Sequence, residues 1–140
     1  MPSGSCICGQ IAYEFSGNPV TTAICHCIDC QKWGGSGFST NIAIPTDAFK
    51  ITSGTPVRFA RKGASGQNHV LGFCGNCGTS LFSQPASLGS VTLIKTGSLN
   101  DAAARDFAVA NELFVKDRRG FASPVAGAAQ MRLDLGGPAA

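Results

Sequence analysis

The chain has 140 residues, of which 44% are hydrophobic and only 14% are charged, and its formal net charge is +3 at pH 7. This length and composition are typical of one folded soluble domain, and the sparse charge excludes long solvent-exposed helices. This net charge is mild, whereas a dedicated nucleic-acid-binding protein usually has a strongly basic patch or stripe.

Short runs of alternating or β-branched residues, separated by turns that contain glycine and proline, predict a mainly β fold. In the run QIAYEF, the alternation places Ile11, Tyr13 and Phe15 on one face of a strand. Further strands are expected at residues 38–44, 49–52, 57–60, 69–74, 79–83, 90–97 and 111–116.

Helical signals are weaker than the strand signals. Short helical turns are expected at residues 27–35 and 45–49, and a longer helix at 99–107 with Asn100 as a possible cap. We expect residues 1–140 to form a single domain, with a core at 4–121 and a C-terminal tail at 122–140.

The first ten residues, MPSGSCICGQ, contain neither the basic nor the apolar segment of a secretory signal. No apolar run approaches the ~20 residues needed to span a membrane. We therefore expect a cytoplasmic protein with no membrane partner. In a reducing compartment, clustered cysteines are metal ligands or catalytic groups more often than disulfides.

Two small basic clusters stand out, one at Arg58, Arg61 and Lys62 and the other within residues 116–119. The interpretation that we favour is ordinary solvated surface. The alternative is recognition of a carboxylate on a small anionic substrate.

The seven cysteines form a Cys-x-Cys, a Cys-x-Cys-x-x-Cys and a Cys-x-x-Cys motif. Seven is odd, so three disulfides would leave one thiol over. In the last motif two thiolates can meet one ion across a tight turn, for which Gly75 and Gly78 allow a left-handed backbone. The first motif can converge from one face of an extended strand. We predict a closed structural zinc site with the ligands Cys6, Cys8, Cys74 and Cys77, the alternative being buried, inert thiols.

Of the remaining three cysteines, Cys25 and Cys27 should share a strand face and Cys30 should return at the following turn, whereas His26 should point the other way. Three ligands without a convincing fourth predict a catalytic zinc site with an exchangeable position. Three thiolates leave such a centre with a formal charge of −1, which suits a soft incoming thiol rather than an activated water. The expected chemistry is therefore making or breaking of a carbon–sulfur bond.

Several neighbours of these cysteines have more than one interpretation. A histidine such as His69 is an ordinary residue more often than a ligand. Asp29 could reach the ion, but the commoner role of such a residue is in a local turn or cap. Lys32, with the loop at 34–38, could line a pocket and bind a developing alkoxide, although a solvated lysine is the commoner role. For Trp33 we favour packing over a role as a pocket wall.

The sequence resembles the glutathione-dependent formaldehyde-activating enzyme family, which also includes the centromere protein V domain. The resemblance depends on all three cysteine motifs in order and extends over most of residues 4–101. The matching segments are GSCICGQIAYEFSG (4–17), CHCIDCQKWGGSGFST (25–40), FCGNCGTSLF (73–82) and TLIKTGSLND (92–101).

The resemblance implies an Mss4-like β fold and two zinc ions per chain. It implies a structural ion on Cys6, Cys8, Cys74 and Cys77, and a catalytic ion on Cys25, Cys27 and Cys30. The implied activity is that of a carbon–sulfur lyase, which condenses glutathione with formaldehyde to S-hydroxymethylglutathione. Glu112 stands where many members of the family have a histidine.

Three functional hypotheses therefore stand beside one another. The first is an enzyme that condenses a thiol, glutathione or a similar one, with formaldehyde or a related carbonyl. The second is a non-catalytic zinc-ribbon module that binds protein or nucleic acid, against which the weak basicity argues. The third is a redox or metal sensor in which Cys27 and Cys30 form a reversible disulfide.

Overall fold

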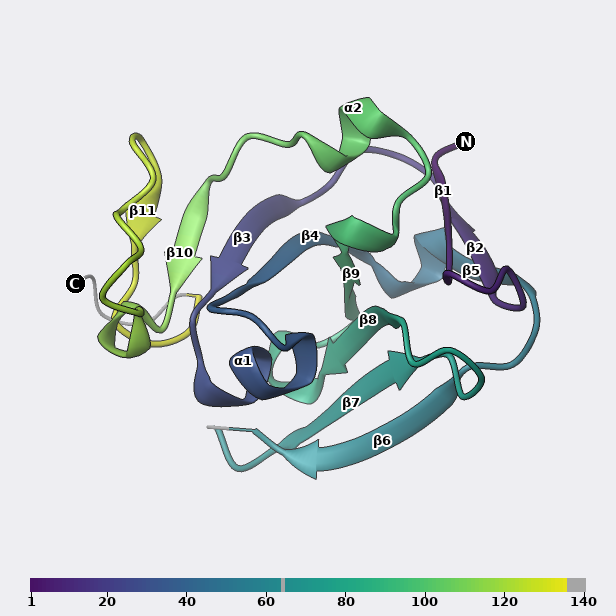
Figure 1. Cartoon of the computed structure of the whole chain (residues 1–140), viewed down its shortest axis with the longest axis horizontal. Helices are drawn as coiled ribbons and strands as arrows, with labels where there is room; N and C mark the ends of the chain where they lie inside the picture. The colour runs from purple at the N-terminus through teal and green to yellow at the C-terminus, as the bar shows by residue number, and fades with distance from the viewer. Residues whose placement is uncertain (64, 136–140) are drawn as a thin grey trace.

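The computed structural model describes residues 1–63 and 65–135, and two β-sheets dominate it (Figure 1). The predicted mainly β class is confirmed. The strands are β1 (Ser3–Ser5), β2 (Ala12–Phe15), β3 (Thr21–Cys25), β4 (Ser39–Pro45), β5 (Phe49–Ser53), β6 (Val57–Lys62), β7 (Asn68–Phe73), β8 (Ser80–Pro85), β9 (Val91–Lys95), β10 (Asn111–Leu113) and β11 (Ala129–Gln130).

The helical segments are short. They are α1 (Ile28–Gly34), α2 (Ala102–Arg105) and the 3-10 turns η1 (Thr46–Ala48), η2 (Ala86–Leu88), η3 (Thr96–Ser98) and η4 (Val115–Asp117). The helical turns expected at 27–35 and 45–49 are thus present, whereas the helix expected at 99–107 is only four residues long. None of the described helices has the length and hydropathy that a bilayer crossing requires.

The smaller sheet has the strand order β1-β2-β5, and the larger has the order β11-β10-β3-β4-β9-β8-β7-β6. Within the larger sheet, β10 runs parallel to both β3 and β11, and the other pairs are antiparallel. The register of β10 on β3 places Glu112 opposite Ile24 and Leu113 opposite Cys25. Strand β10, from near the C-terminal end of the chain, therefore lies beside β3, which leads into the motif of Cys25, Cys27 and Cys30.

The hydrophobic core lies on one face of the larger sheet and is closed by the smaller one. Tyr13 of β2, Ile44 of β4, Phe82 of β8 and Ile94 of β9 are completely buried there. Removing such side chains from water contributes roughly 1.5–3 kcal/mol each. The expected burial of Ile11, Tyr13 and Phe15 on one side is confirmed.

The opposite face of the same strands is also covered, which the alternation alone does not reveal. In β4, Asn41 and Ala43 are buried as well as Ile42 and Ile44, so both faces of this strand are enclosed. Because successive side chains of a strand point to opposite faces, Asn41 and Lys95 project away from the core. They line a cavity on that side of the sheet.

The strands that carry the clearest alternation were predicted from the sequence, and three others were not. Strands β2 and β4 to β10 correspond to expected runs, with boundaries that shift by one to three residues. The short β1 and β11 and the strand β3 as a whole were not expected; only Cys25 and Cys27 were expected to share a strand face, and Cys27 lies beyond the end of β3. The sequences of β1 and β11, SGS and AQ, have no pattern that separates them from loops, whereas TTAIC of β3 contains β-branched residues that favour a strand.

The end of the described chain folds back over β10. The backbone N–H groups of Phe114 and Val115 donate to the carbonyls of Leu133 and Met131, and Leu135 packs near Cys25 and Leu113. The part of the expected tail that the structure describes, residues 122–135, therefore contacts the cavity region. Residues 136–140 lie outside the described residues.

Candidate functional site

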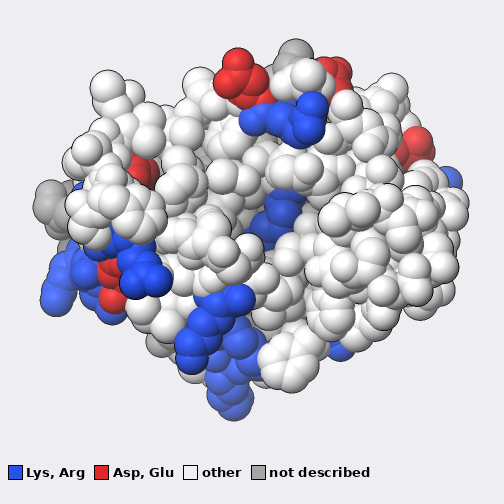
Figure 2. Space-filling model, in the orientation of Figure 1, with Lys and Arg blue, Asp and Glu red and all other residues white. Residues whose placement is uncertain are grey.

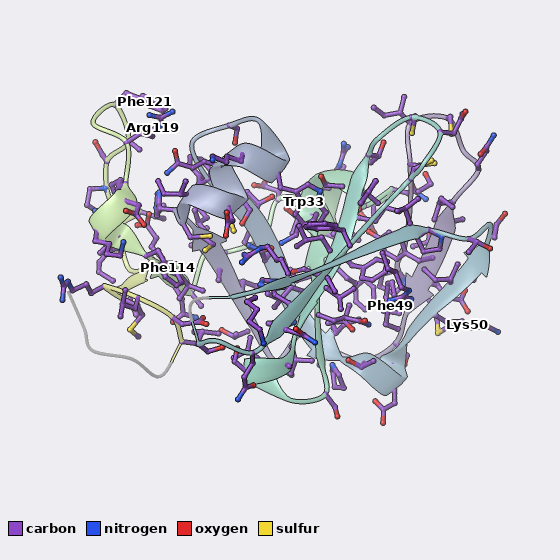
Figure 3. The ribbon with its side chains drawn as sticks, turned by 90° about the horizontal axis from the view of Figure 1, so that it is seen from below. Trp33, Phe49, Lys50, Phe114, Arg119 and Phe121 are labelled. Carbon is purple, nitrogen blue, oxygen red and sulfur yellow. The ribbon has the colours of Figure 1, made fainter. Side chains whose placement is uncertain are left out.

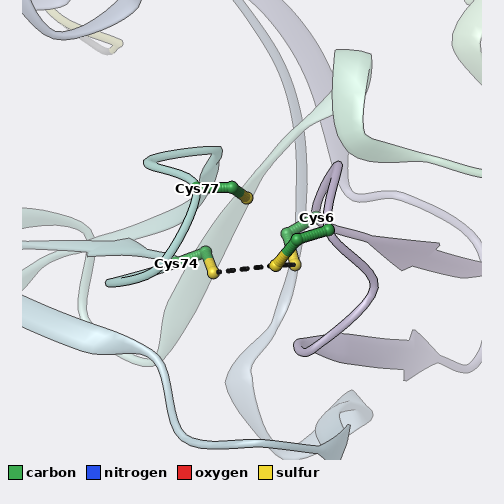
Figure 4. Close-up of side chains that lie close together, drawn as sticks. Cys6, Cys74 and Cys77 are labelled. Atoms are coloured by element: carbon green, nitrogen blue, oxygen red, sulfur yellow. Dashed lines mark hydrogen bonds between the residues drawn. The ribbon is translucent and has the colours of Figure 1, made fainter.

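The first group of cysteines joins two distant turns of the chain. Cys6 and Cys8 follow β1, and Cys74 and Cys77 follow β7 (Figure 4). The Sγ atoms of Cys6 and Cys8 are 3.5 Å apart, and those of Cys8 and Cys74 are 3.7 Å apart. All four sulfurs lie within 4.8 Å of one another. We call this set the four-cysteine cluster.

These distances fit a tetrahedral metal site. A Zn–S distance of about 2.3 Å places the sulfurs of a tetrahedral site about 3.8 Å apart. The backbone N–H of Ile11 donates to Cys6 Sγ at 3.2 Å, and the Thr79 hydroxyl lies 3.2 Å from Cys77 Sγ. Hydrogen bonds to Thr79 and to backbone groups lower the pKa of Cys77 to about 5. The cluster can therefore hold a metal ion.

The local geometry differs from the expectation in two respects. Cys6 and Cys8 do not lie in an extended strand, because the turn closed by the Gly9 N–H and the Cys6 carbonyl brings them together. Ile7 still points away and is exposed. Of the two glycines in the second turn, only Gly78 has a positive φ, of 78°, so Gly75 is not needed for a left-handed backbone.

The second group, which we call the triad, contains Cys25, Cys27 and Cys30 at the junction of β3 and α1. Cys25 ends β3, Cys27 caps α1 by accepting from the backbone N–H of Cys30 at 3.2 Å, and Cys30 lies in the first turn. Their sulfurs lie within 4.8 Å of one another. In the described residues, no histidine or carboxylate joins this group as a fourth member.

The pKa values of the three triad thiols differ. Hydrogen bonds from the thiols of Cys25 and Cys27 lower the pKa of Cys30 to about 2, with a further contribution from the positive charge of Lys95. Hydrogen bonds to Cys27 and Cys30, together with burial, raise the pKa of Cys25 well above its usual value. Among the three cysteines, negative charge therefore resides on Cys30, and binding a metal ion requires Cys25 and Cys27 to release their protons as well.

His26 points away from the triad, as the sequence predicted. Its Nε2 atom lies 2.8 Å from Oε1 of Glu112, and both side chains are almost fully buried. The other oxygen of Glu112 accepts from Gln130 Nε2 and from the backbone N–H of Val125, each at 2.7 Å. From β10, Glu112 thus connects His26, which lies between two triad ligands, to Val125 and Gln130 near the end of the described chain.

Lys95 is a functional candidate that the sequence analysis missed. It ends β9 and is 9% exposed, and its Nζ donates to Asn41 Oδ1 at 2.5 Å and lies 5.2 Å from the centre of the Trp33 ring. Burial lowers the pKa of Lys95, and the nearby triad sulfurs, Cys30 foremost, oppose that effect. No carboxylate of the described residues forms an ion pair with this ammonium.

Both the triad and Lys95 line a cavity of about 110 Å³ on the face of the larger sheet opposite the core. Its walls come from β3, β4 and β9, from the hairpin of β6 and β7, and from the end of the described chain. Apolar walls are contributed by Ala23, Ala43, Leu93, Leu113, Phe114 and Leu135, and polar groups by Ser39, Asn41, Gln67, Asn68 and Ser83.

The β6–β7 hairpin brings Arg61 and His69 to the mouth of this cavity, where the two residues pair across the strands. Arg61 Nη1 lies 2.9 Å from Asp29 Oδ2, so Asp29 contacts a distant strand instead of a local turn. Burial and the positive charges of Arg61 and Lys95 lower the pKa of His69 to about 4. His69 is therefore neutral at pH 7.

The neighbours that the sequence suggested as a pocket wall lie elsewhere. Lys32 and parts of the 34–38 loop line a separate shallow groove with Arg119 and Phe121, and Lys32 is exposed. In Figure 3, Trp33 points toward the middle of the molecule, while Arg119 and Phe121 lie together at one end. The Trp33 ring contacts Lys95, and Trp33 itself is not among the residues that line the cavity.

The fold and the two cysteine groups define a mainly β protein with two candidate metal centres, one of which opens into a cavity. The model of the glutathione-dependent formaldehyde-activating enzyme family matches residues 1–117. The chain therefore belongs to this family, which confirms the resemblance noted from its motifs.

Among solved structures, a crystal structure of a Rhodobacter sphaeroides protein is similar, with a TM-score of 0.59 and 18% sequence identity. The match covers 76% of this chain and 96% of that one. This similarity supports the fold alone. No match was found among curated proteins.

Proposed function

We propose that this protein is a zinc-dependent carbon–sulfur lyase-type enzyme that condenses a small thiol, glutathione or a similar one, with formaldehyde or a related carbonyl. The triad of Cys25, Cys27 and Cys30 would hold the catalytic zinc. The four-cysteine cluster would hold a second, structural zinc. Membership in the formaldehyde-activating family supports the reaction class.

The observation that carries the proposal is the open side of the triad. Three sulfurs converge, and no histidine or carboxylate of the described residues joins them as a fourth ligand. The site faces a cavity. Three protein ligands with an open position are typical of catalytic zinc, whereas four are typical of structural zinc. A non-catalytic zinc-ribbon module would have no use for such a cavity.

Zinc on the triad would supply a position at which a thiol binds as its thiolate. The chain's own residues then have two tasks, to orient the carbonyl compound and to supply a proton. As the sulfur forms its bond to the carbonyl carbon, the carbonyl oxygen gains negative charge. The thiol's proton must end on that oxygen, so the reaction consumes and releases no net proton.

Lys95 is suited to the second task. Its ammonium lies in the cavity beside the triad, is oriented by Asn41 and has no carboxylate partner in the described structure. A buried positive charge at this place stabilises the developing alkoxide and can pass a proton to it. The proton that the next thiol loses on binding restores the ammonium.

The test is a zinc count on the wild type and on Cys27→Ser, each with and without added thiol. We expect two ions per chain in the wild type, one in the variant, loss of thiol binding in the variant and an unchanged far-ultraviolet circular dichroism spectrum. One ion in both proteins, with thiol binding retained in the variant, would refute the proposal.

A further inference from the structure

The mouth of the cavity carries an ion pair that the proposed chemistry does not use. Arg61 reaches it from the end of β6, and Asp29 reaches it from the first turn of α1, between two triad ligands. The Asp29 side chain is 53% exposed and that of Arg61 is 20% exposed. An ion pair this exposed contributes little stability, so the fold does not account for it.

The Arg61 guanidinium has unused hydrogen-bonding capacity. Its Nη1 atom donates to the Lys62 carbonyl at 2.9 Å and contacts Asp29 at 2.9 Å. Its Nε atom is buried and has no hydrogen-bond partner in the described structure. A guanidinium offers five N–H donors in a planar fork, which matches the two oxygens of a carboxylate. The existing ion pair therefore leaves donors for a second carboxylate.

Other basic side chains lie on the same side of the molecule as Arg61 (Figure 2). Lysine and arginine side chains gather over α1 and the nearby end of β6 in Figure 2. Apart from the triad and Asp29, the lining contains one other acidic side chain, Asp134, whose Oδ1 accepts from the backbone N–H of Leu135. The neighbouring His69 is neutral, so it neither attracts nor repels an acid group through charge.

We propose that Arg61 binds a carboxylate of the substrate thiol, so that the site selects thiols carrying an acid group over neutral thiols. This inference rests on the proposed function, because the sulfur end of the same molecule would occupy the open side of the triad. The substrate is then held at two points, its sulfur at the triad and its carboxylate at the mouth. Asp29 competes with that carboxylate for Arg61 in the empty site.

The experiment compares two thiols of similar size, 3-mercaptopropionate and 2-mercaptoethanol, which differ in the presence of a carboxylate. Dissociation constants are measured by calorimetry on zinc-loaded wild type, Arg61→Gln, Asp29→Asn and the control Arg58→Gln. Arg58 belongs to the same strand but does not line the cavity, since its guanidinium bonds Gln84 and lies over the Phe82 ring. Zinc content and thermal unfolding establish that each variant is folded and loaded.

Arg61→Gln should weaken the binding of 3-mercaptopropionate about tenfold, the effect of losing one charged hydrogen-bonding partner. Its effect on 2-mercaptoethanol should stay below about twofold. Asp29→Asn should act in the opposite direction and strengthen the binding of 3-mercaptopropionate, because it removes the competing carboxylate. Arg58→Gln should leave both thiols unchanged.

Equal effects of Arg61→Gln on the two thiols, or none on 3-mercaptopropionate, would overturn the proposal while leaving the thiol site intact. Weaker binding of 3-mercaptopropionate to Asp29→Asn would also overturn it. If wild type binds neither thiol, the proposed function itself fails, and this inference fails with it.

Discussion

Replacing Glu112 by glutamine tests the buried network beside the triad. The carboxylate is 1% exposed and accepts from His26, Gln130 and the backbone N–H of Val125. Burial opposes its ionisation, yet these hydrogen bonds lower its pKa from 4.5 to about 2. A shift of this size corresponds to about 3 kcal/mol of folding free energy at neutral pH. The glutamine cannot replace it, because one end of its amide is a donor facing other donors.

The sign of the pH dependence follows from the lowered pKa. Glu112 stabilises the folded state fully above pH 4.5, and this contribution is lost as the pH falls toward 2. The difference in unfolding free energy between wild type and Glu112→Gln, measured by urea denaturation at pH 7 to 8, should therefore be about 3 kcal/mol. Glu14→Gln, outside the network, should change the unfolding free energy by less than about 0.5 kcal/mol. Equal effects of the two substitutions would refute the reasoning.

Three further predictions concern the core and the two metal centres. Gly72→Ala should lower the unfolding free energy by about 1–3 kcal/mol, measured by thermal unfolding, because an added Cβ would lie 2.3 Å from the Phe82 ring. Gly97→Ala, whose added Cβ meets open space, should change the unfolding free energy little, and equal effects of the two substitutions would contradict this. Lys95→Met should lower the turnover of thiol with formaldehyde about 10²-fold at unchanged zinc content, and turnover within about twofold of wild type would remove Lys95 from the mechanism. Cys74→Ser should abolish the cooperative thermal transition, because structural zinc contributes folding free energy directly; a normal transition with one zinc lost would show that the cluster is dispensable.

The spacing of the cysteines contained most of the information needed to place them. Two cysteines separated by one or two residues converge through local turns, so the division into four and three could be predicted without knowing the fold. The structure brings the same two sets together, while their roles as zinc ligands stay a prediction. The local reason was partly wrong for Cys6 and Cys8, which converge through a turn that a strand pattern does not indicate.

The cavity was not predictable in the same way, because its walls come from distant segments. The parallel pairing of β10 with β3 joins Leu113 to Cys25, and no local pattern specifies such a register. Alternation in β9 places Lys95 opposite to the core-facing Ile94, which was a usable signal, but it suggests solvent rather than an enclosed cavity. Arg61 likewise looked like surface charge until the hairpin placed it at the cavity mouth.

The most direct test of the account is the sulfur coordination of zinc in the loaded protein, measured by X-ray absorption before and after addition of 2-mercaptoethanol. Because one ion would have four cysteine sulfurs and the other three, we expect an average of about 3.5 sulfurs per zinc, rising to about 4 when the thiol binds. In Cys27→Ser, which should retain only the four-cysteine site, the average should be about 4 with and without thiol. An average of 4 in the wild type from the start, unchanged by thiol, would contradict an open position at the triad.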